Sequence, residues 1–296
     1  MDAQALRRKL RYGRQRTERV LKRIGAGLVA YATWPVWRNT RALFVLSTGR
    51  TGTTTLARLL NLSSEIEAFH QPQPELLKAR QAARWEIHAE PGKYRHIFVR
   101  ARGTPLFQAV RKGRMYAETS ARLTFFAPVI ADLLPKARFL FIHRDPVGLI
   151  RSGMKRGWYV DHPADYARVR PVKGEPFFDR WETMSPFEKV CWYWNVYNDF
   201  ALRFCQHVDS SRVLIVQASN LFDGTAVPEI FDLLDCRKPA DKDIDRVLKK
   251  KLNAQQEGSF PEAEEWSPSM HDTLWSIAGD TMEQLGYSAE DYANQG

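Results

Sequence analysis

Cysteine is scarce in this sequence, and the cysteines present form no recognisable metal or disulfide pattern. Cys191, Cys205 and Cys236 contain no CxxC pair and no zinc spacing. Disulfide scaffolds are dense in cysteine, so this sparse set indicates a reducing compartment, and we expect a cytoplasmic protein that is either free or peripheral at a membrane. The seven histidines are scattered and form no HExxH motif, so we expect no metal site.

Long apolar runs and internal repeats are also lacking. The uncharged stretch IGAGLVAYATWPVW (residues 24–37) is shorter than the roughly 20 residues needed to cross a bilayer. The basic region before it is too long for a signal peptide, and no clear cleavage site follows. With a membrane span and a signal peptide both disfavoured, the sequence predicts a soluble globular protein. Its hydrophobic content of 44% is enough for a sizeable core.

Positive charge is concentrated near the N-terminus. The formal net charge is +10, and residues 1–40 carry ten Lys or Arg against Asp2 and Glu18. We therefore divide the chain into a basic extension (1–40) and an α/β domain (41–296). Apolar residues recur at helical spacing over residues 6–37, which fits a helix lying on a membrane surface. A helix docked on its own domain and a solvated tail fit equally, whereas nothing else in the chain supports nucleic-acid binding.

Strand-like and helix-like segments alternate through the rest of the chain. Strands are expected at residues 43–46, 67–69 and 115–118, in 137–146 together with the charged turn that ends it, and in 212–221 together with the exit of the strand. Helices are expected at residues 53–60, 75–89, 122–134, 147–156, 187–206, 228–235 and 268–285. This alternation predicts a mainly parallel central sheet with helices on both faces, whose ligands bind at the carboxyl ends of the strands.

A Walker lysine is the most informative absence. STGRTGTTTL (residues 47–56) follows an apolar run and opens a helical pattern, as a phosphate-binding loop does. Gly49 and Gly52 permit tight turns and the close approach of an anion. A nucleoside-triphosphate loop would continue with Lys and then Ser or Thr, whereas Thr53 follows Gly52 and the charge belongs to Arg50. The loop therefore predicts a smaller transferable group, with Arg50 over a bridging oxygen.

A second candidate anion site follows the strand at residues 137–143. In FLFIHRDPVGLIRSG (139–153), Arg144 ends the strand, where its guanidinium can hold a phosphate through two hydrogen bonds. Ser152 comes about two helical turns later and can reach the same oxygens. Taken alone, the RDP sequence also fits a structural turn in which Arg144 pairs with an acid. Both loops lie at carboxyl ends of strands, so they are expected to face one pocket.

Together these stretches resemble the sulfotransferases that use 3′-phosphoadenylyl sulfate (PAPS). RTGTTTL is similar to their 5′-phosphosulfate loop, and HRDP followed by Ser152 is similar to their 3′-phosphate motif. CWYWNVYND (191–199) and VLIVQASNLFDG (213–224) also resemble family segments, with Asn220 where an acid is usual. The resemblance covers roughly residues 42–235 and implies a P-loop-like fold, PAPS as co-substrate and no metal. The donor-binding residues that it implies are Thr48, Gly49, Arg50, Thr51, Gly52, Thr53, Thr54, Arg144 and Ser152.

The reaction that the resemblance implies needs a base to take a proton from the acceptor. Relatives often carry His-Glu-Pro after the second strand, and this chain has His70-Gln71-Pro72. A glutamine cannot take the proton, so we assign catalytic roles to Arg50 and His70, although His70 also fits a cap or a substrate contact. Other candidate bases are Glu75, Asp161 and His162.

The acceptor stays open between a small alcohol, a saccharide and a lipid-linked hydroxyl or amine. Aromatic residues of the loop region 157–186 either line its pocket or pack the loop on the body: Trp158, Tyr159, Phe177, Phe178 and Trp181. The basic run at residues 249–251 fits a loop over the nucleotide or a solvated charge cluster. Two other functions are compatible with the sequence, a P-loop kinase or NTPase and a non-catalytic membrane-associated protein on the same fold.

Overall fold

The computed structural model describes residues 37–250 and 259–288. Five strands form one sheet in the order β2-β3-β1-β4-β5, and every adjacent pair is parallel. The strands are β1 (Ala42–Leu46), β2 (Ile66–Phe69), β3 (Met115–Glu118), β4 (Ala137–His143) and β5 (Val213–Gln217). The predicted fold class, a parallel sheet flanked by helices, is therefore confirmed.

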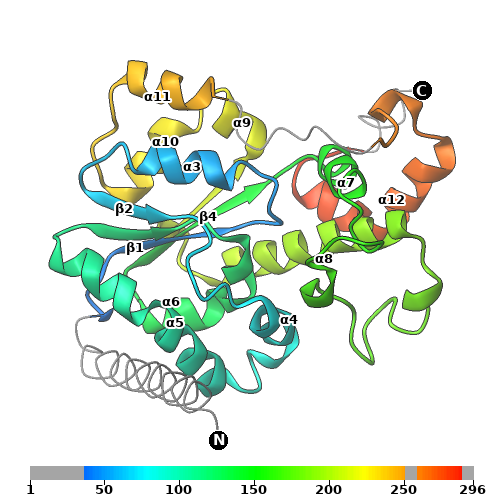
Figure 1. The fold of residues 1–296 in the computed structure, drawn as a ribbon, viewed down its shortest axis with the longest axis horizontal. Helices are drawn as coiled ribbons and strands as arrows, with labels where there is room; N and C mark the ends of the chain where they lie inside the picture. The colour runs from blue at the N-terminus through cyan, green and yellow to red at the C-terminus, as the bar shows by residue number, and fades with distance from the viewer. Residues whose placement is uncertain (1–36, 251–258, 289–296) are drawn as a thin grey trace, which may run out of the picture.

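Helices cover both faces of this sheet (Figure 1). The α-helices are α3 (Thr53–Leu60), α4 (Leu77–Glu86), α5 (Pro91–Arg111), α6 (Ala127–Leu133), α7 (Pro146–Met154), α8 (Pro186–His207), α9 (Ala218–Phe222), α10 (Val227–Leu234), α11 (Asp241–Leu248) and α12 (Pro268–Gln284). Short 3-10 helices are η1 (Ala121–Phe126), η2 (Asp165–Ala167), η3 (Trp181–Thr183), η4 (Ser210–Arg212) and η5 (Ala263–Glu265).

The central strand β1 is buried along its whole length, as its apolar sequence requires. Leu43 and Val45 pack with α3, α10 and their neighbours, whereas Phe44 and Leu46 pack with α5, α6 and α8 on the opposite face. In Figure 1, α3 and α9 to α11 accordingly lie on one side of the sheet, and α4 to α6 and α8 lie on the other. Two cores therefore hold the strand ends in fixed positions.

Three structural details differ from the sequence predictions. The helix expected at residues 75–89 ends at Glu86, but Pro91 then opens α5, a helix of 21 residues that the sequence analysis missed. Proline fits the first helical turn, where its missing N–H has no partner to lose. The helix predicted at residues 122–134 is divided into η1 and α6 near Pro128. The short helix α11 was also missed.

Most of the predicted basic extension, residues 1–36, lies outside the described residues. Its last aromatic residue, Trp37, is only 2% exposed and packs in the core beneath the sheet, so this side chain is not available to a membrane surface. In the part of the chain that the structure describes, no helix is both long enough and apolar enough to cross a bilayer.

A fully buried ion pair fixes the carboxyl end of β3. Arg102 on α5 donates from Nε and Nη2 to the two carboxylate oxygens of Glu118 at 2.6 and 2.9 Å, and Tyr116 donates to the same carboxylate at 2.8 Å. Arg102 also donates to the carbonyl of Pro74 at 2.8 Å. Both charged side chains are 0% exposed. The pair thus ties the loop after β2 to the end of β3, next to the candidate site.

Candidate active site

A cavity of about 900 Å³ opens at the carboxyl ends of the strands. Every predicted donor-binding residue except Thr51 lines it, and so does His70. Thr51 is fully buried and does not line the cavity. The cationic lining residues are Arg50, Arg80, Arg122, Arg144, Arg151, Lys155, Arg156 and Arg168. Among the described residues, no Asp or Glu lines the cavity, so its surface is built to receive an anion.

The loop between β1 and α3 adopts an unusual backbone conformation. Gly49 and Gly52 have φ of 79° and 83°, and Arg50 between them has φ of 61°, a left-handed value that a non-glycine residue rarely adopts. A Cβ on Gly52 would lie 2.9 Å from the ring of Phe222, so close packing also requires glycine there. Gly52 precedes α3 without a side-chain cap, and the first turn of the helix therefore presents its amides to the cavity.

Contacts from β4 and α8 hold this loop in place. Arg144 Nη1 donates to the carbonyl of Arg50 at 2.9 Å, and the Tyr193 hydroxyl donates to the carbonyl of Thr48 at 2.8 Å. Trp194 in turn donates from Nε1 to the carbonyl of Arg144 at 2.9 Å. The structure therefore brings the two predicted anion sites together at the sheet edge.

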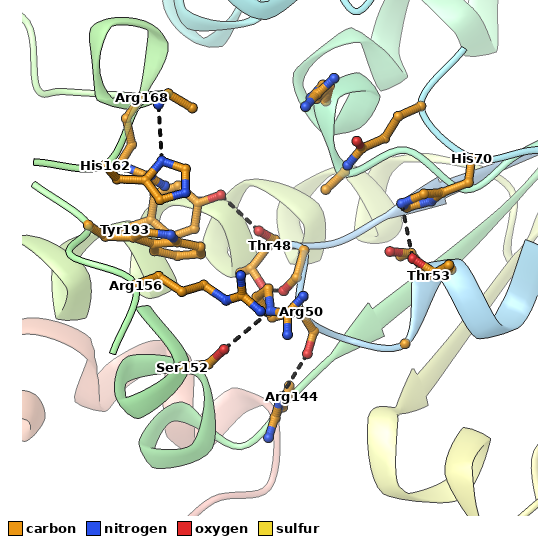
Figure 2. A pocket seen from close by; sticks show the side chains of 18 of the residues that line it. Thr48, Arg50, Thr53, His70, Arg144, Ser152, Arg156, His162, Arg168 and Tyr193 are labelled. Carbon is orange, nitrogen blue, oxygen red and sulfur yellow. Dashed lines mark hydrogen bonds between the residues drawn. The ribbon is translucent and has the colours of Figure 1, made fainter. Parts of the chain in front are cut away.

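Three guanidinium groups converge beside the loop (Figure 2). Arg50 donates from Nε to the hydroxyl of Ser152 at 3.2 Å. Burial, followed by the charges of Arg156 and Arg144, lowers the pKa of Arg50 to about 10. Burial likewise lowers the pKa of Arg144. Like charges held together in a partly dry site repel one another until an anion binds, so the cluster is suited to a multiply charged ligand.

In the RDP sequence after β4, Arg144 and Asp145 have different structural roles. The Asp145 carboxylate accepts from the amide of Gly148 at 2.6 Å and caps α7. A Cβ on Gly148 would lie 3.2 Å from Arg144 Nη2, so glycine leaves room for that guanidinium. Asp145 therefore caps the helix, while the hydrogen bond to the Arg50 carbonyl directs Arg144 to the loop.

A segment near the C-terminus reaches the outer side of α7. Arg151 donates from Nε to the carbonyl of Pro261 at 3.1 Å and pairs with Glu262, which Lys155 also approaches at 3.4 Å. The predicted basic run contributes nothing comparable: Lys249 pairs with Asp245 at 3.7 Å on the exposed surface, and residue 251 lies outside the described residues.

His70 stands at the junction of α3, β2 and β3. Its Nε2 lies 3.2 Å from Thr54 Oγ1, and its Nδ1 lies 3.1 Å from Thr119 Oγ1. The Thr119 hydroxyl can donate to the carbonyl of Phe69 at 3.4 Å, and it then accepts from Nδ1–H of the ring. In that tautomer, the lone pair of Nε2 is on the side of Thr54, where a proton acceptor would be needed.

The electrostatic environment keeps His70 neutral. Burial lowers the pKa of His70, and although the hydrogen bond at Thr119 opposes this effect, the charge of Arg122 adds to it. The neutral form, which can accept a proton, is therefore favoured at neutral pH.

The other candidate bases are less well placed. Glu75 forms an ion pair with Arg122, and neither Glu75 nor Asp161 lines the cavity. His162 does line it, but its Nδ1 accepts from the amide of Ala164 at 3.0 Å, so the neutral ring carries its proton on Nε2. Of these groups, His70 has the geometry that best suits a base.

Most of the aromatic residues of the loop region 157–186 that were candidates for the acceptor pocket pack the loop instead. Only Trp158 lines the cavity. Trp181 is buried with its ring centroid 5.0 Å from that of Trp192, and the Tyr159 hydroxyl donates to the carbonyl of Val169 at 2.6 Å. Phe177 contacts the guanidinium of Arg180. These residues mainly pack the loop on the body of the protein.

Several lining residues were missed by the sequence analysis. Arg156 follows Ser152 by four residues, a spacing that places both on one helical face and could have revealed it. Arg122 comes shortly after the end of β3, at the same sheet edge as the two loops. Arg80, Tyr193 and Phe222 carry no local signal, because helix packing alone brings them to the cavity.

Comparison with known proteins identifies the family to which this fold belongs. The sequence matches the profile of the sulfotransferase family over residues 42–221. Sulfotransferase STF9 from Mycobacterium avium has a similar structure, with a TM-score of 0.50 and 13% identity over 84% of this chain and 78% of that one.

Two further structures are similar over most of their length. A sulfotransferase from Alicyclobacillus acidocaldarius is 14% identical, with a TM-score of 0.49 over 86% of this chain and 99% of that one. The sulfotransferase domain from the curacin biosynthetic pathway is 13% identical, with a TM-score of 0.49 over 84% of this chain and 98% of that one. No curated protein sequence matches the chain significantly. The chain belongs to the sulfotransferase family, as its two loop motifs predicted.

The convergence of Arg50, Arg144 and Arg156 generates a first prediction. Inorganic pyrophosphate should raise the thermal unfolding temperature because it relieves their mutual repulsion. Arg144→Gln should weaken pyrophosphate binding by roughly tenfold or more, the usual effect of losing a charged hydrogen bond. Arg58→Gln, on the exposed side of α3, is the matched control and should bind as the native protein does. Equal affinities of the two variants, measured by calorimetry, would contradict the assignment.

Proposed function

We propose that the protein transfers a sulfuryl group from PAPS to a hydroxyl or amine acceptor. The observation that carries the proposal is the contact between Arg144 and the Arg50 carbonyl, because it places the two family motifs at one end of one cavity. A nucleotide that bears a phosphosulfate at its 5′ position and a phosphate at its 3′ position carries the two anionic groups that a pair of such sites would bind.

We assign the donor-binding roles to residues that line the cavity. Gly49, Gly52, Thr53 and Thr54 hold the 5′ side through the amides and hydroxyls at the start of α3. Arg144 and Ser152 hold the 3′-phosphate. Remaining donor contacts are assigned to Thr48 and to the backbone of Thr51, whose side chain is buried. Phe222 is 46% exposed beside Gly52 and offers a flat apolar surface to the nucleotide base.

Catalysis is assigned to Arg50 and His70. PAPS supplies an activated sulfuryl group, whose S–O bond to the bridging oxygen breaks as the acceptor oxygen forms its own bond to sulfur. Arg50 stabilises the negative charge on the departing bisphosphate. His70 Nε2 takes the acceptor proton. Fixed guanidinium groups supply the positive charge at this site, so the proposal requires no metal.

Nucleotide preference tests the proposed donor. Adenosine 3′,5′-bisphosphate should raise the unfolding temperature by several degrees, because its two phosphates fill both arginine sites. ATP with magnesium should have a smaller effect, since the loop has no Walker lysine, and AMP should have the smallest. Stabilisation by ATP with magnesium but not by the bisphosphate would instead favour a kinase or NTPase.

The proposed base is tested by its substitution and by pH. His70→Gln cannot accept the proton, so kcat for sulfate transfer from PAPS should fall by about 10²- to 10⁴-fold, while bisphosphate affinity stays within about twofold. Because the folded pKa of His70 is lowered, the native rate should rise with pH through a limb below about pH 6.5 and be flat near neutrality. His96→Gln, on the exposed side of α5, is the control. A His70→Gln enzyme that keeps its kcat and its acidic limb would exclude this base.

We also propose that residues 1–40 form a basic extension that brings a cytoplasmic enzyme to an anionic membrane surface. Support comes from its ten Lys or Arg and its apolar spacing. The full chain should co-sediment with vesicles containing phosphatidylserine and much less with neutral phosphatidylcholine vesicles. Neutralising the charge by replacing Arg7, Arg8 and Lys9 with Gln should weaken this binding. Equal sedimentation with both lipids would contradict an electrostatic attachment.

A further inference from the structure

The order of the strands separates the cavity into two parts. Arg50 and Arg144 follow β1 and β4, whereas His70 follows β2 and η1 follows β3 on the other side of β1. Figure 2 likewise shows His70 on the side of the loop away from Arg144 and Ser152. With the donor held at the ends of β1 and β4, the part of the cavity at the ends of β2 and β3 is left for the acceptor.

That acceptor part has its own positive charge. Arg80 on α4 is 7% exposed and lines the cavity, with one hydrogen bond, from Nη2 to the carbonyl of Ala167 at 3.1 Å. Its Nε has no hydrogen-bond partner among the described residues. Arg80 forms no ion pair with any Asp or Glu of the described residues, 37–250 and 259–288. Arg80 therefore brings to the cavity wall a guanidinium charge that no ion pair with a described carboxylate neutralises.

Arg122 on η1 stands between Arg80 and His70. Its charge acts on the pKa of His70, and the charge of Arg80 in turn lowers the pKa of Arg122 after the larger effect of burial. Glu75 forms an ion pair with Arg122 from outside the cavity lining. One carboxylate therefore faces two guanidinium groups, which leaves a positive charge next to the candidate base.

The adjoining wall, which Arg80 contacts at the Ala167 carbonyl, adds a third arginine that already has a carboxylate partner. Arg168 donates to Asp165 at 2.6 Å, and its guanidinium carbon lies 4.2 Å from the centroid of Trp158. Trp158 and Tyr193 give this wall a flat apolar surface. The charge that is not fully balanced is thus shared by Arg80 and Arg122, which line the same cavity as His70.

We propose that the acceptor is an alcohol that also carries an anionic group, a phosphate, sulfate or carboxylate, and that Arg80 and Arg122 bind this group. The inference rests on the proposed function, since it takes the donor to occupy the ends of β1 and β4. Binding of the anionic group orients the neighbouring hydroxyl toward His70 and the start of α3. A neutral alcohol lacks this anchor and leaves the two guanidinium groups unsatisfied.

The test uses the full chain saturated with adenosine 3′,5′-bisphosphate, so that the donor site is filled before any second ligand is added. Calorimetry then measures the binding of three probes: inorganic phosphate, glycerol 3-phosphate and glycerol. Both phosphate-bearing probes should bind at least about tenfold more tightly than glycerol, as expected for a charged hydrogen bond. Arg122→Gln should remove most of this preference, Arg122→Lys should retain part of it, and bisphosphate affinity should change by less than about twofold in both.

Arg100→Gln is the matched control, because it removes an exposed arginine that does not line the cavity. Thermal unfolding establishes that each variant is folded, and the lysine variant preserves the charge if the glutamine variant is unstable. Equal binding of glycerol and the phosphate probes, or no binding of the phosphate probes, would overturn this inference alone. Failure of the bisphosphate itself to bind would overturn the proposed function, and this inference with it.

Discussion

The hydrogen bond from Arg144 to the Arg50 carbonyl is the contact on which the geometry of the cavity depends. Arg50 has a left-handed backbone conformation that costs about 1 kcal/mol or more for a side chain with a Cβ, so surrounding contacts must hold it. Arg144 supplies one such contact from the end of β4, and Tyr193 supplies a second contact two residues earlier, at the Thr48 carbonyl. Both come from elements anchored in the core, so the loop keeps its shape because the sheet and α8 keep theirs.

That geometry also concentrates positive charge where folding alone does not favour it. The pKa of Arg50 is lowered because burial and two neighbouring guanidinium groups make its charged form less stable. The two cores and the buried pair of Arg102 and Glu118 hold the surrounding backbone despite this repulsion. An anionic substrate offsets the repulsion when it binds, so part of the affinity for the donor is stored in the folded protein.

Residues whose role follows from local sequence could be predicted, and residues whose role depends on packing could not. The loop at residues 47–56 and the turn around Arg144 each combine a strand end, a special backbone and a charge within a few residues, so their function can be read locally. Arg80 reaches the cavity only because α4 packs against η1, which no spacing in the sequence indicates. The helix α5 was missed because Gly103 and Pro105 interrupt its pattern, although a long helix can retain them when its inner face is buried in the core.

The strand order explains how one cavity can serve two substrates without mixing their sites. The polypeptide crosses from β1 to the edge strand β2 and returns to β3, so the residues after β2 and β3 lie on one side of the loop and those after β4 on the other. His70 is at the boundary, because one of its partners, Thr54, belongs to the helix after β1 and the other, Thr119, follows β3. In the proposed function, a base at that boundary contacts the helix assigned to the donor and faces the part of the cavity assigned to the acceptor. The chemistry assigned to His70 is therefore a consequence of the topology as much as of the imidazole.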